Sequence, residues 1–372
     1  MKKVKAIQFR MLLDGQGIVN YDSKEQKWVH IHNETGLEGD YNGRNENVNF
    51  AKKNFYKTGV RTAAGKEVLD TRIKISSDCL KKNLFNEDII ATSPNLMHHD
   101  SILYNYLASP VALLRGWMFT EKNSLKRKGA LVIVDAEQVN GAMPYIEVFA
   151  KAETKLSKQE HDDKSSATYY HTESVGKMKY RTDGDIDIAQ LQLVSVDETL
   201  DRFAFNPDNF NLFKKFFETY FGSADIKLAY NKLKSSVIDL DEYSIMLKDE
   251  YIKEIVKGFL IKALKLKIRK RNSFASCELL EVRLVTDPTV QTSSNEDGWL
   301  PIKTVNDIQN LLESIEFYKF YEEVDHTLAC EKRDSIEEDK KKKAEEKKED
   351  KKKKAEEKKD GKKKSKEDDI TA

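Results

Sequence analysis

The chain has 372 residues, enough for one large domain or two ordinary ones with a real hydrophobic core. Charged residues make up 34% of it, yet the formal net charge is only +1. Residues 331–372 hold 18 Lys and Arg against 15 Asp and Glu, which leaves 46 basic and 48 acidic residues in 1–330. The sequence is therefore not that of a globally basic nucleic-acid-binding protein, and any anionic partner has to be held by local patches.

The cysteines and the N-terminus indicate the compartment. Cys79, Cys277 and Cys330 are far apart and form no CxxC pair or zinc pattern, which favours a reducing environment over a disulfide scaffold. Gln8 and Arg10 interrupt the first apolar run too early for a signal peptide, and no stretch reaches the length of a membrane span. We therefore expect a soluble cytoplasmic protein without a membrane partner.

Residues 4–13 alternate apolar and polar side chains, and this period of two predicts a first strand. Residues 14–49 are rich in Gly, Asn and Asp, which favours irregular loops or a hairpin extension. His30 and His32 would lie on one face of a strand there and could share a metal ion, although an exposed pair on a hairpin is the commoner outcome.

Residues 57–75 resemble a phosphate-binding loop but lack its essential spacing. Five residues separate Gly59 from Gly65 where the P-loop has four, and Glu67 stands where a Ser or Thr has to ligate magnesium. We therefore exclude nucleotide hydrolysis by this motif. The cations of this stretch still suit contact with a polyanion, and they are Lys57, Arg61 and Lys66 on a Gly-containing loop and Arg72 and Lys74 on a strand-like run.

The stretch 109–137 predicts a helix, a basic turn and a buried strand in succession. Ser109 can cap the helix, and Pro110 suits its first position because its missing N–H is not needed there. The uninterrupted apolar run 130–134 favours a buried central strand. A helix that delivers cations to the edge of a sheet can hold phosphates, although a core helix joined to a core strand by a solvated turn fits the pattern equally well. The helix face is formed by Leu113, Leu114, Trp117 and Met118, and the cations are Arg115, Lys122 and the turn Lys126, Arg127 and Lys128.

Residues 145–149 predict another strand, whereas residues 151–180 are polar and charged and favour an excursion from the body, such as a long hairpin. The TDGDIDI run at 182–188 is spaced like a calcium loop but lacks the required glycine and the final glutamate. Residues 187–196 then predict a strand, and the shift in their apolar phase indicates a bulge.

Three amphipathic helices with clear boundaries follow. The first opens at 206–207 and ends at Gly222, and the longest has apolar residues at spacings of three and four from 252 to 264. The alternation at 280–284 predicts a strand with one wet face, and Thr304 begins the last helix.

The longest helix ends in a run without acidic residues. Cations near a helix C-terminus are expected from the helix dipole alone. Their density beyond residue 266 exceeds what capping requires, so four of them are candidates for contact with an anion. These are Lys267, Arg269, Lys270 and Arg271.

Beyond residue 335 the composition collapses to Lys, Glu, Asp and Ala, and KKKKAEEKK occurs at 340–348 and again at 351–359. Almost nothing there can be buried, so this is a solvated helix or a disordered tail. The order of elements before it predicts an α+β fold with an RRM/ferredoxin-like sheet core and large insertions. We expect a body at 1–330, with a thumb-like excursion at about 150–181 and a helical part at about 205–270, and a charged tail at 331–372.

With these elements the sequence resembles the backbone subunits of CRISPR Cascade complexes, in the RAMP superfamily, and most closely those of variant type I-F systems. The resemblance is carried by SPVALLRGWMF at 109–119 and its continuation through SLKRKG into ALVIVDAE, which ends at 137. The loop around 59–66 and the polar excursion at 151–180, where such subunits have a thumb-like hairpin, support it.

The resemblance implies a non-catalytic RAMP-like subunit that binds CRISPR RNA along its backbone for antiviral defence. It would polymerise head to tail on the RNA and leave the bases free to pair with target DNA. Its partners would be CRISPR RNA, target DNA through the guide, other copies of itself and other Cascade subunits. By position, the resemblance places Arg61, Lys66, Arg115 and the turn at 126–128 near the RNA groove.

Two other functions stay open at this point. An RNA-processing nuclease of the same superfamily would use His30, His32 or Asp70, and a DNA-binding accessory protein is the second alternative. No Ser/His/Asp, Cys/His or carboxylate–metal constellation supports the first, and no helix-turn-helix or zinc pattern supports the second. We therefore predict no hydrolytic activity, no metal and no cofactor.

Overall fold

The structure is a computed structural model that describes residues 3–22, 50–63, 65, 67–85, 99–119, 125–141, 145–151, 168–235, 241–270, 273–286, 298–325, 327 and 329. Several predictions concern residues outside these ranges, namely those on His30, His32, Lys66, Lys122, Arg271 and the tail beyond residue 330.

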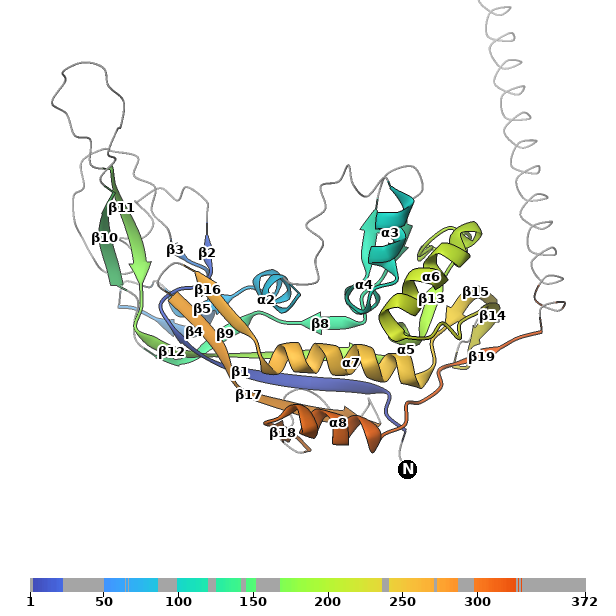
Figure 1. The fold of residues 1–372 in the computed structure, drawn as a ribbon. Coiled ribbons are helices and arrows are strands. Elements are labelled where there is room, and N and C mark those ends of the chain that lie inside the picture. Colours follow the sequence, from blue (N-terminus) through green and yellow to red (C-terminus); the bar gives the residue numbers. More distant parts are fainter. Residues whose placement is uncertain are drawn as a thin grey trace, which may run out of the picture.

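A nine-stranded antiparallel sheet forms the centre of the molecule (Figure 1). Its strands follow the order β16-β17-β1-β12-β9-β5-β4, with β18 added to β17 and β8 added to β12. The bounds are β1 Ala6–Gln16, β4 Lys53–Arg61, β5 Glu67–Ile75, β8 Leu131–Ile133, β9 Ala136–Gly141, β12 Lys177–Asp187, β16 Lys267–Lys270, β17 Ser273–Val285 and β18 Leu300–Ile302.

Strand β1 lies at the middle of this sheet, between β12 and β17. The predicted first strand is confirmed, and it extends to Gln16. Its side chains alternate as expected, and Ile7, Phe9 and Met11 are completely buried. The ring of Phe9 lies over Gly184 of β12, where a Cβ would overlap it, so glycine is required at this crossing.

The two faces of the sheet differ in what covers them. Helices α2 Ser77–Leu84, α7 Asp249–Leu264 and α8 Val305–Glu313 lie on one face, here called the helical face (Figure 1). The opposite face, called the polar face, carries the other side chains of β1. There Arg10 pairs with Asp183 at 3.0 Å, and Arg283 donates to Gln8 at 3.0 Å.

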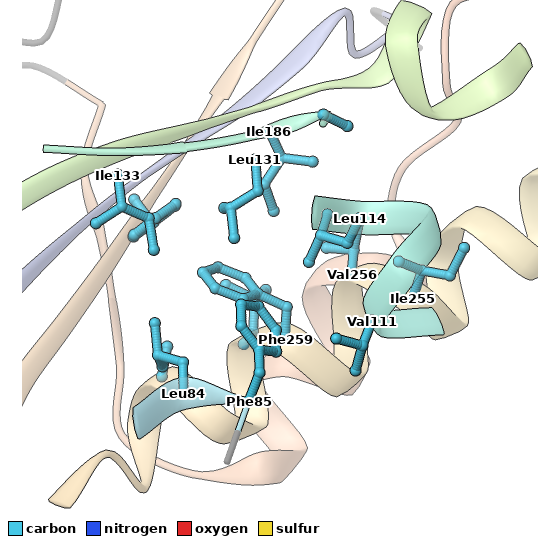
Figure 2. Packing of buried hydrophobic residues seen from close by; sticks show 14 of the residues in the cluster. Leu84, Phe85, Val111, Leu114, Leu131, Ile133, Ile186, Ile255, Val256 and Phe259 are labelled. Atoms are coloured by element: carbon cyan, nitrogen blue, oxygen red, sulfur yellow. The ribbon is translucent and has the colours of Figure 1, made fainter. Parts of the chain in front are cut away.

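The core is the apolar layer between the sheet and these helices. Figure 2 shows Leu131, Ile133 and Ile186 of the sheet pointing toward Phe259 of α7 and Phe85 at the end of α2. Phe259 also meets the ring of Phe9 edge-on, with centroids 4.9 Å apart. Burying each such side chain contributes roughly 1.5–3 kcal/mol.

A second, four-stranded sheet stands beyond one end of α7 (Figure 1), in the order β13-β15-β14-β19. The remaining strands form three two-stranded ribbons, β2 with β3, β6 with β7 and β10 with β11. The bounds of these elements are β13 Leu193–Ser195, β14 Leu228–Leu233, β15 Asp241–Met246, β19 Tyr321–Glu323, β2 Tyr21–Asp22, β3 Phe50–Ala51, β6 Trp117–Phe119, β7 Leu125–Arg127, β10 Tyr145–Lys151 and β11 Thr168–Ser174.

The remaining helices are α3 Asp100–Leu107, α4 Pro110–Arg115, α5 Ile188–Gln192, the 3₁₀ turn η2 Pro207–Asn209 and α6 Phe210–Phe221. The predicted boundaries at Gly222 and Thr304 are confirmed, whereas the described cations expected at the end of the longest helix lie in β16. Gly222 ends α6 with φ 73°, α7 begins at Asp249, and Thr304 caps α8 through reciprocal bonds with Asp307.

Three predictions on local structure are wrong. The run 130–134 is not a buried central strand, because β8 pairs only with β12 and leaves Val132 and Val134 about half exposed. Residues 187–196 are not one strand: the phase shift marks α5, which Asp187 caps, followed by β13. The expected helical part at 205–270 also contains β14 and β15.

The expected excursion at about 150–181 contains the β10–β11 hairpin, while its last residues belong to β12 of the main sheet. Taken together, the chain is an α+β protein with a large antiparallel sheet and several helices, as the sequence predicts.

Candidate nucleic-acid interface

The stretch that was expected to hold phosphates, 109–129, folds differently from its prediction. Helix α4 begins as expected, because the hydroxyl of Ser109 accepts from the N–H of Ala112 at 3.2 Å. It ends at Arg115, since Gly116 turns the chain with φ 73°. Residues 117–119 are then a strand, β6, not a continuation of the helix.

The basic turn is also a strand. Leu125–Arg127 pairs with β6, so Lys126 and Arg127 point to opposite sides. Trp117 is buried in β6, whereas Met118 is 67% exposed and belongs to no apolar helix face. The predictions of one helix through residue 118 and of a solvated turn at 126–128 are therefore wrong.

Arg127 is buried, with 4% of its surface exposed. Its guanidinium donates to the carbonyl of Leu113, to that of Gln190 at 2.9 Å and to that of Leu193 at 3.4 Å. It also stacks on Trp117, 5.7 Å from the ring centroid. Burial lowers the pKa of Arg127 to about 10, so it remains protonated at neutral pH. Arg127 holds the fold and is not available to a phosphate.

The neighbouring cations of this stretch differ in how available they are. Lys126 forms an ion pair with Asp201 at 2.7 Å, and Lys128 is exposed. Arg115, the last residue of α4, is half-buried, and its guanidinium lies 5.4 Å from the centroid of Phe85. Arg115 is therefore presented beside the end of α2.

Helix α2 gathers three lysines that are far apart in the sequence. Burial raises the pKa of the Cys79 thiol on this helix, and the positive charges of Lys270, Lys52 and Lys82 oppose that rise. Lys52 precedes β4, at one edge of the main sheet, and Lys270 ends β16, at the other edge. Lys82 lies on α2 itself, so three parts of the chain contribute positive charge around this helix.

Strand β16 divides the cations predicted at 267–271 between the two faces. Ile268 is buried on the helical face opposite Ala275, and the period of two places Lys270 on that face as well. Lys267 and Arg269 point to the polar face, where Arg269 lies opposite the partly exposed Phe274. Only Lys270 of this strand joins the lysines around α2.

The cations predicted on a loop at 57–66 lie on the β4–β5 hairpin. Lys57 is in β4, 78% exposed and 3.4 Å from Glu67, and Arg61 ends β4 in an exposed position. On β5, Arg72 pairs with Asp70 at 2.9 Å, so this carboxylate is occupied by an arginine. The loop predicted at 57–66 is therefore shorter than expected, because residues 57–61 belong to β4 and only the residues between β4 and β5 connect the two strands.

Four cations lie on α2 or act on residues at this helix, and we call them the α2 track: Lys52, Lys82, Lys270 and Arg115. A helix of eight residues such as α2 is about 12 Å long, so the track is short. Sequence reasoning found Arg115 and Lys270 but missed Lys52 and Lys82. Each of these two stands in an unremarkable local context; Lys82 lies on α2 itself, and Lys52 directly precedes β4.

An apolar hollow of about 430 Å³ adjoins the track. Phe85, whose ring contacts the guanidinium of Arg115, forms one wall of the hollow. Residues of α4, α6 and α7 form the other walls. Its floor is open at Gly258 in the middle of α7, where a Cβ would meet no atom within 4 Å. Its rim carries one acid and one base, Glu254 and Lys262.

These observations define the class of the protein as an α+β protein with a large antiparallel sheet and several helices. The comparison with protein families names it more closely: the family model described as "Type I-Fv CRISPR-associated protein Cas7fv-like" matches residues 3–290. The chain therefore belongs to the Cas7fv-like family of type I-Fv CRISPR-associated proteins, which confirms the resemblance stated from the sequence.

Among solved structures, the chain is similar to one described as "CRISPR RNA-guided surveillance complex", with 11% identity over 83% of each chain and a TM-score of 0.36. A second is described as "CRISPR RNA-guided surveillance complex, pre-nicking", with 10% identity over 78% of this chain and 83% of the other, and a TM-score of 0.37. No curated protein matches the chain.

The described part of the chain holds no group of three or more His, Cys, Asp or Glu side chains that could bind a metal ion. Among its helices, none has the length and apolar character of a membrane span.

Proposed function

We propose that this protein is a non-catalytic backbone subunit of a type I CRISPR surveillance complex, and that its α2 track holds the phosphates of CRISPR RNA. The proposal is supported by the family and by the placement of three cations: Lys82 lies on α2, Lys52 directly precedes β4 and Lys270 ends β16, and the positive charge of each lowers the pKa of the Cys79 thiol on α2. Cations that several parts of the chain contribute to one helix suit an extended anion such as the backbone of RNA.

The family supplies the identity of that anion. A Cas7fv-like protein belongs to a CRISPR system, and its partners are CRISPR RNA, target DNA through the guide, further copies of itself and other Cascade subunits. Cations that contact phosphates hold a strand without reading its sequence, which is what a subunit repeated along a guide requires. The bases then remain free to pair with target DNA.

The finer architecture follows from the same proposal. We interpret β17, β1 and β12, with α7 on one face, as an RRM/ferredoxin-like core that carries large insertions. The β10–β11 hairpin would be the thumb-like excursion, within a body at 1–330 followed by a charged tail at 331–372. We place the protein in the cytoplasm, where the RNA and its targets are.

The test is the salt dependence of binding to single-stranded RNA. Replacing Lys52, Lys82 and Lys270 together by alanine should weaken binding uniformly across RNA sequences. Each cation that neutralises a phosphate contributes about 0.7 to the slope of log K against log salt, so the slope should flatten by roughly 2. Thermal stability should hardly change, because exposed cations contribute little to it.

The matched control is the double variant Lys267→Ala/Arg269→Ala, which removes two cations from the same strand but from the polar face. Its affinity and slope should equal those of the wild type. If the slope of log K against log salt flattens in the control variant and stays unchanged in the triple variant, the RNA lies on the polar face. The proposal that the α2 track binds RNA is then wrong.

A nuclease of the same superfamily is the alternative that the experiment also addresses. Of the residues considered for it, Asp70 is paired with Arg72. We expect labelled single-stranded RNA to stay intact with the purified protein in magnesium or manganese. Cleavage that disappears in Asp70→Asn or His30→Ala would establish the nuclease instead.

A further inference from the structure

The segment 126–130 fits against the end of α4 more closely than a simple connection would. The last carbonyl groups of a helix have no partner within it and need donors from elsewhere. In α4, the carbonyl of Leu113 accepts from the guanidinium of Arg127, and that of Leu114 accepts from the N–H of Ala130 at 2.9 Å. The carbonyl of Ala112 accepts from the N–H of Gly116 at 2.8 Å. One short segment thus supplies most of the C-terminal cap of α4.

The backbones also touch at this point. A Cβ on Gly129 would overlap the carbonyl group of Arg115, and a Cβ on Gly116 would overlap the carbonyl of Arg127 and the backbone of Gly129. Gly116 is also in the left-handed region, with φ 73°. The two glycines let the chain segments on either side of β6 and β7 cross in direct contact, so the position of the Arg115 backbone is set by Gly129.

Arg127 ties this crossing to the rest of the body. The same guanidinium that holds Leu113 of α4 also holds Gln190 in α5 and Leu193 at the start of β13. A planar group with five donors suits this, because it can satisfy several carbonyls at fixed angles. Trp117, on which Arg127 stacks, donates to the carbonyl of Ala204 at 2.9 Å and closes the arrangement.

We infer that Arg127, with Gly116 and Gly129, is a positioning device for Arg115: it sets the end of α4 so that the Arg115 guanidinium lies on Phe85 within the α2 track. The inference rests on the proposed function, since it assigns Arg127 a role in RNA binding that acts through Arg115. Arg127 touches no RNA itself. Arg127, the middle cation of SLKRKG, therefore supports RNA binding from a buried position, through its effect on Arg115.

The test separates position from charge by moving Arg115 without removing a cation. Gly129→Ala forces a methyl group against the Arg115 backbone and changes no charge. The readout is the slope of log K against log salt for a labelled single-stranded RNA. Arg115→Ala should flatten the slope by about 0.7. Gly129→Ala should flatten it by the same amount, and the double variant should lose no more than Arg115→Ala alone.

The control is Gly222→Ala, which strains a left-handed helix end at α6 with no atom within 4 Å of the added Cβ. It should cost stability but leave the RNA slope unchanged. Circular dichroism establishes that each variant is folded. If Gly129→Ala does not fold, Arg127→Lys replaces it: this variant keeps the charge but not the planar fork, and it should lose part of the same slope.

The outcomes distinguish the positioning role of Arg127 from the contact of Arg115 with RNA. A folded Gly129→Ala or Arg127→Lys that binds like the wild type, while Arg115→Ala is weakened, overturns the positioning role alone. The positioning role is also overturned if the double variant binds RNA more weakly than Arg115→Ala by the full loss that Gly129→Ala shows alone. Losses of binding free energy that add in this way come from independent effects. If Arg115→Ala itself binds like the wild type, the contact of Arg115 with RNA is wrong as well, whatever the lysine triple variant does.

Discussion

Two segments of this chain, SLKRKG at 124–129 and LKIRKR at 266–271, look alike in the sequence and have opposite structural roles. Both contribute a short strand, β7 and β16. In β16 the buried residue is Ile268, and the cations Lys267, Arg269 and Lys270 are all exposed. In β7 the residue that points inward is Arg127, and it meets the carbonyl ends of α4 and α5.

This difference shows that a run of cations in the sequence does not by itself indicate that their side chains lie at the protein surface. A buried guanidinium is tolerated where several acceptors surround it, and helix ends provide such acceptors without any carboxylate. The composition of the two runs is nearly the same. The two strands differ in which residue points inward, Arg127 in β7 and Ile268 in β16. They also differ in the groups that surround this residue.

The largest expected effect tests this contrast directly. Arg127→Met keeps the volume but removes all donors and leaves buried carbonyls of α4 and α5 without partners. We expect a loss of about 3 kcal/mol in the free energy of unfolding, because each unsatisfied buried group costs about 1–3 kcal/mol. Urea denaturation measures it.

The matched variant is Arg269→Met on β16, which is exposed and should change the free energy of unfolding by less than about 0.5 kcal/mol. Equal effects of the two substitutions would show that burial of Arg127 contributes nothing particular to stability.

A smaller effect concerns a half-buried carboxylate, which needs donors where Arg127 needs acceptors. Asp185 on the polar face has its pKa raised to about 6, mainly by burial and also by the nearby charge of Asp187, while a hydrogen bond from Gln8 opposes the rise. A carboxyl whose pKa is higher in the folded state costs stability once it ionises. The cost is absent near pH 4 and complete above about pH 7.

Asp185→Asn should therefore be more stable than the wild type at pH 7.5, by about 1 kcal/mol after allowing for solvent screening, and equally stable at pH 4. Thermal or urea unfolding of both proteins across this range measures the difference. A gap that does not close on acidification would contradict the assigned pKa.

The smallest effect is expected from the two outer cations of SLKRKG. Lys126 is already paired with Asp201, and Lys128 lies outside the α2 track, so Lys126→Ala/Lys128→Ala should change the salt slope of RNA binding by less than about 0.7. Stability should also stay within about 0.5 kcal/mol, because an exposed ion pair contributes little. A drop in slope near 1.4 would return the segment to the RNA interface.

Much of the local structure could be predicted because short-range physics decides it. The alternation in 4–13 specifies one face of β1, and the end signals at Gly222 and Thr304 specify where α6 ends and α8 begins. The family resemblance, too, is carried by a contiguous stretch, and the family match confirms it.

The candidate interface could be predicted only in part. Arg115 and Lys270 stand in segments whose composition draws attention, whereas Lys52 and Lys82 do not. Lys82 lies on α2 itself, whereas the positions of Lys52 and Lys270 relative to it depend on pairing between strands as far apart in the chain as β1 and β17, and no periodicity within a segment encodes that.

By itself, the sequence determined the first strand, the end of α6, the start of α8, the α+β class and the family. Only the tertiary structure decided which cations lie at the surface and which hold the fold. The physical reason is that hydrophobic period and capping act within a few residues, while the environment of a side chain is set by whatever distant segment packs against it. Arg127 is the clearest example: its neighbours Leu113, Gln190 and Leu193 are fixed by the crossing of four elements, and they turn a candidate phosphate contact into a buried helix cap.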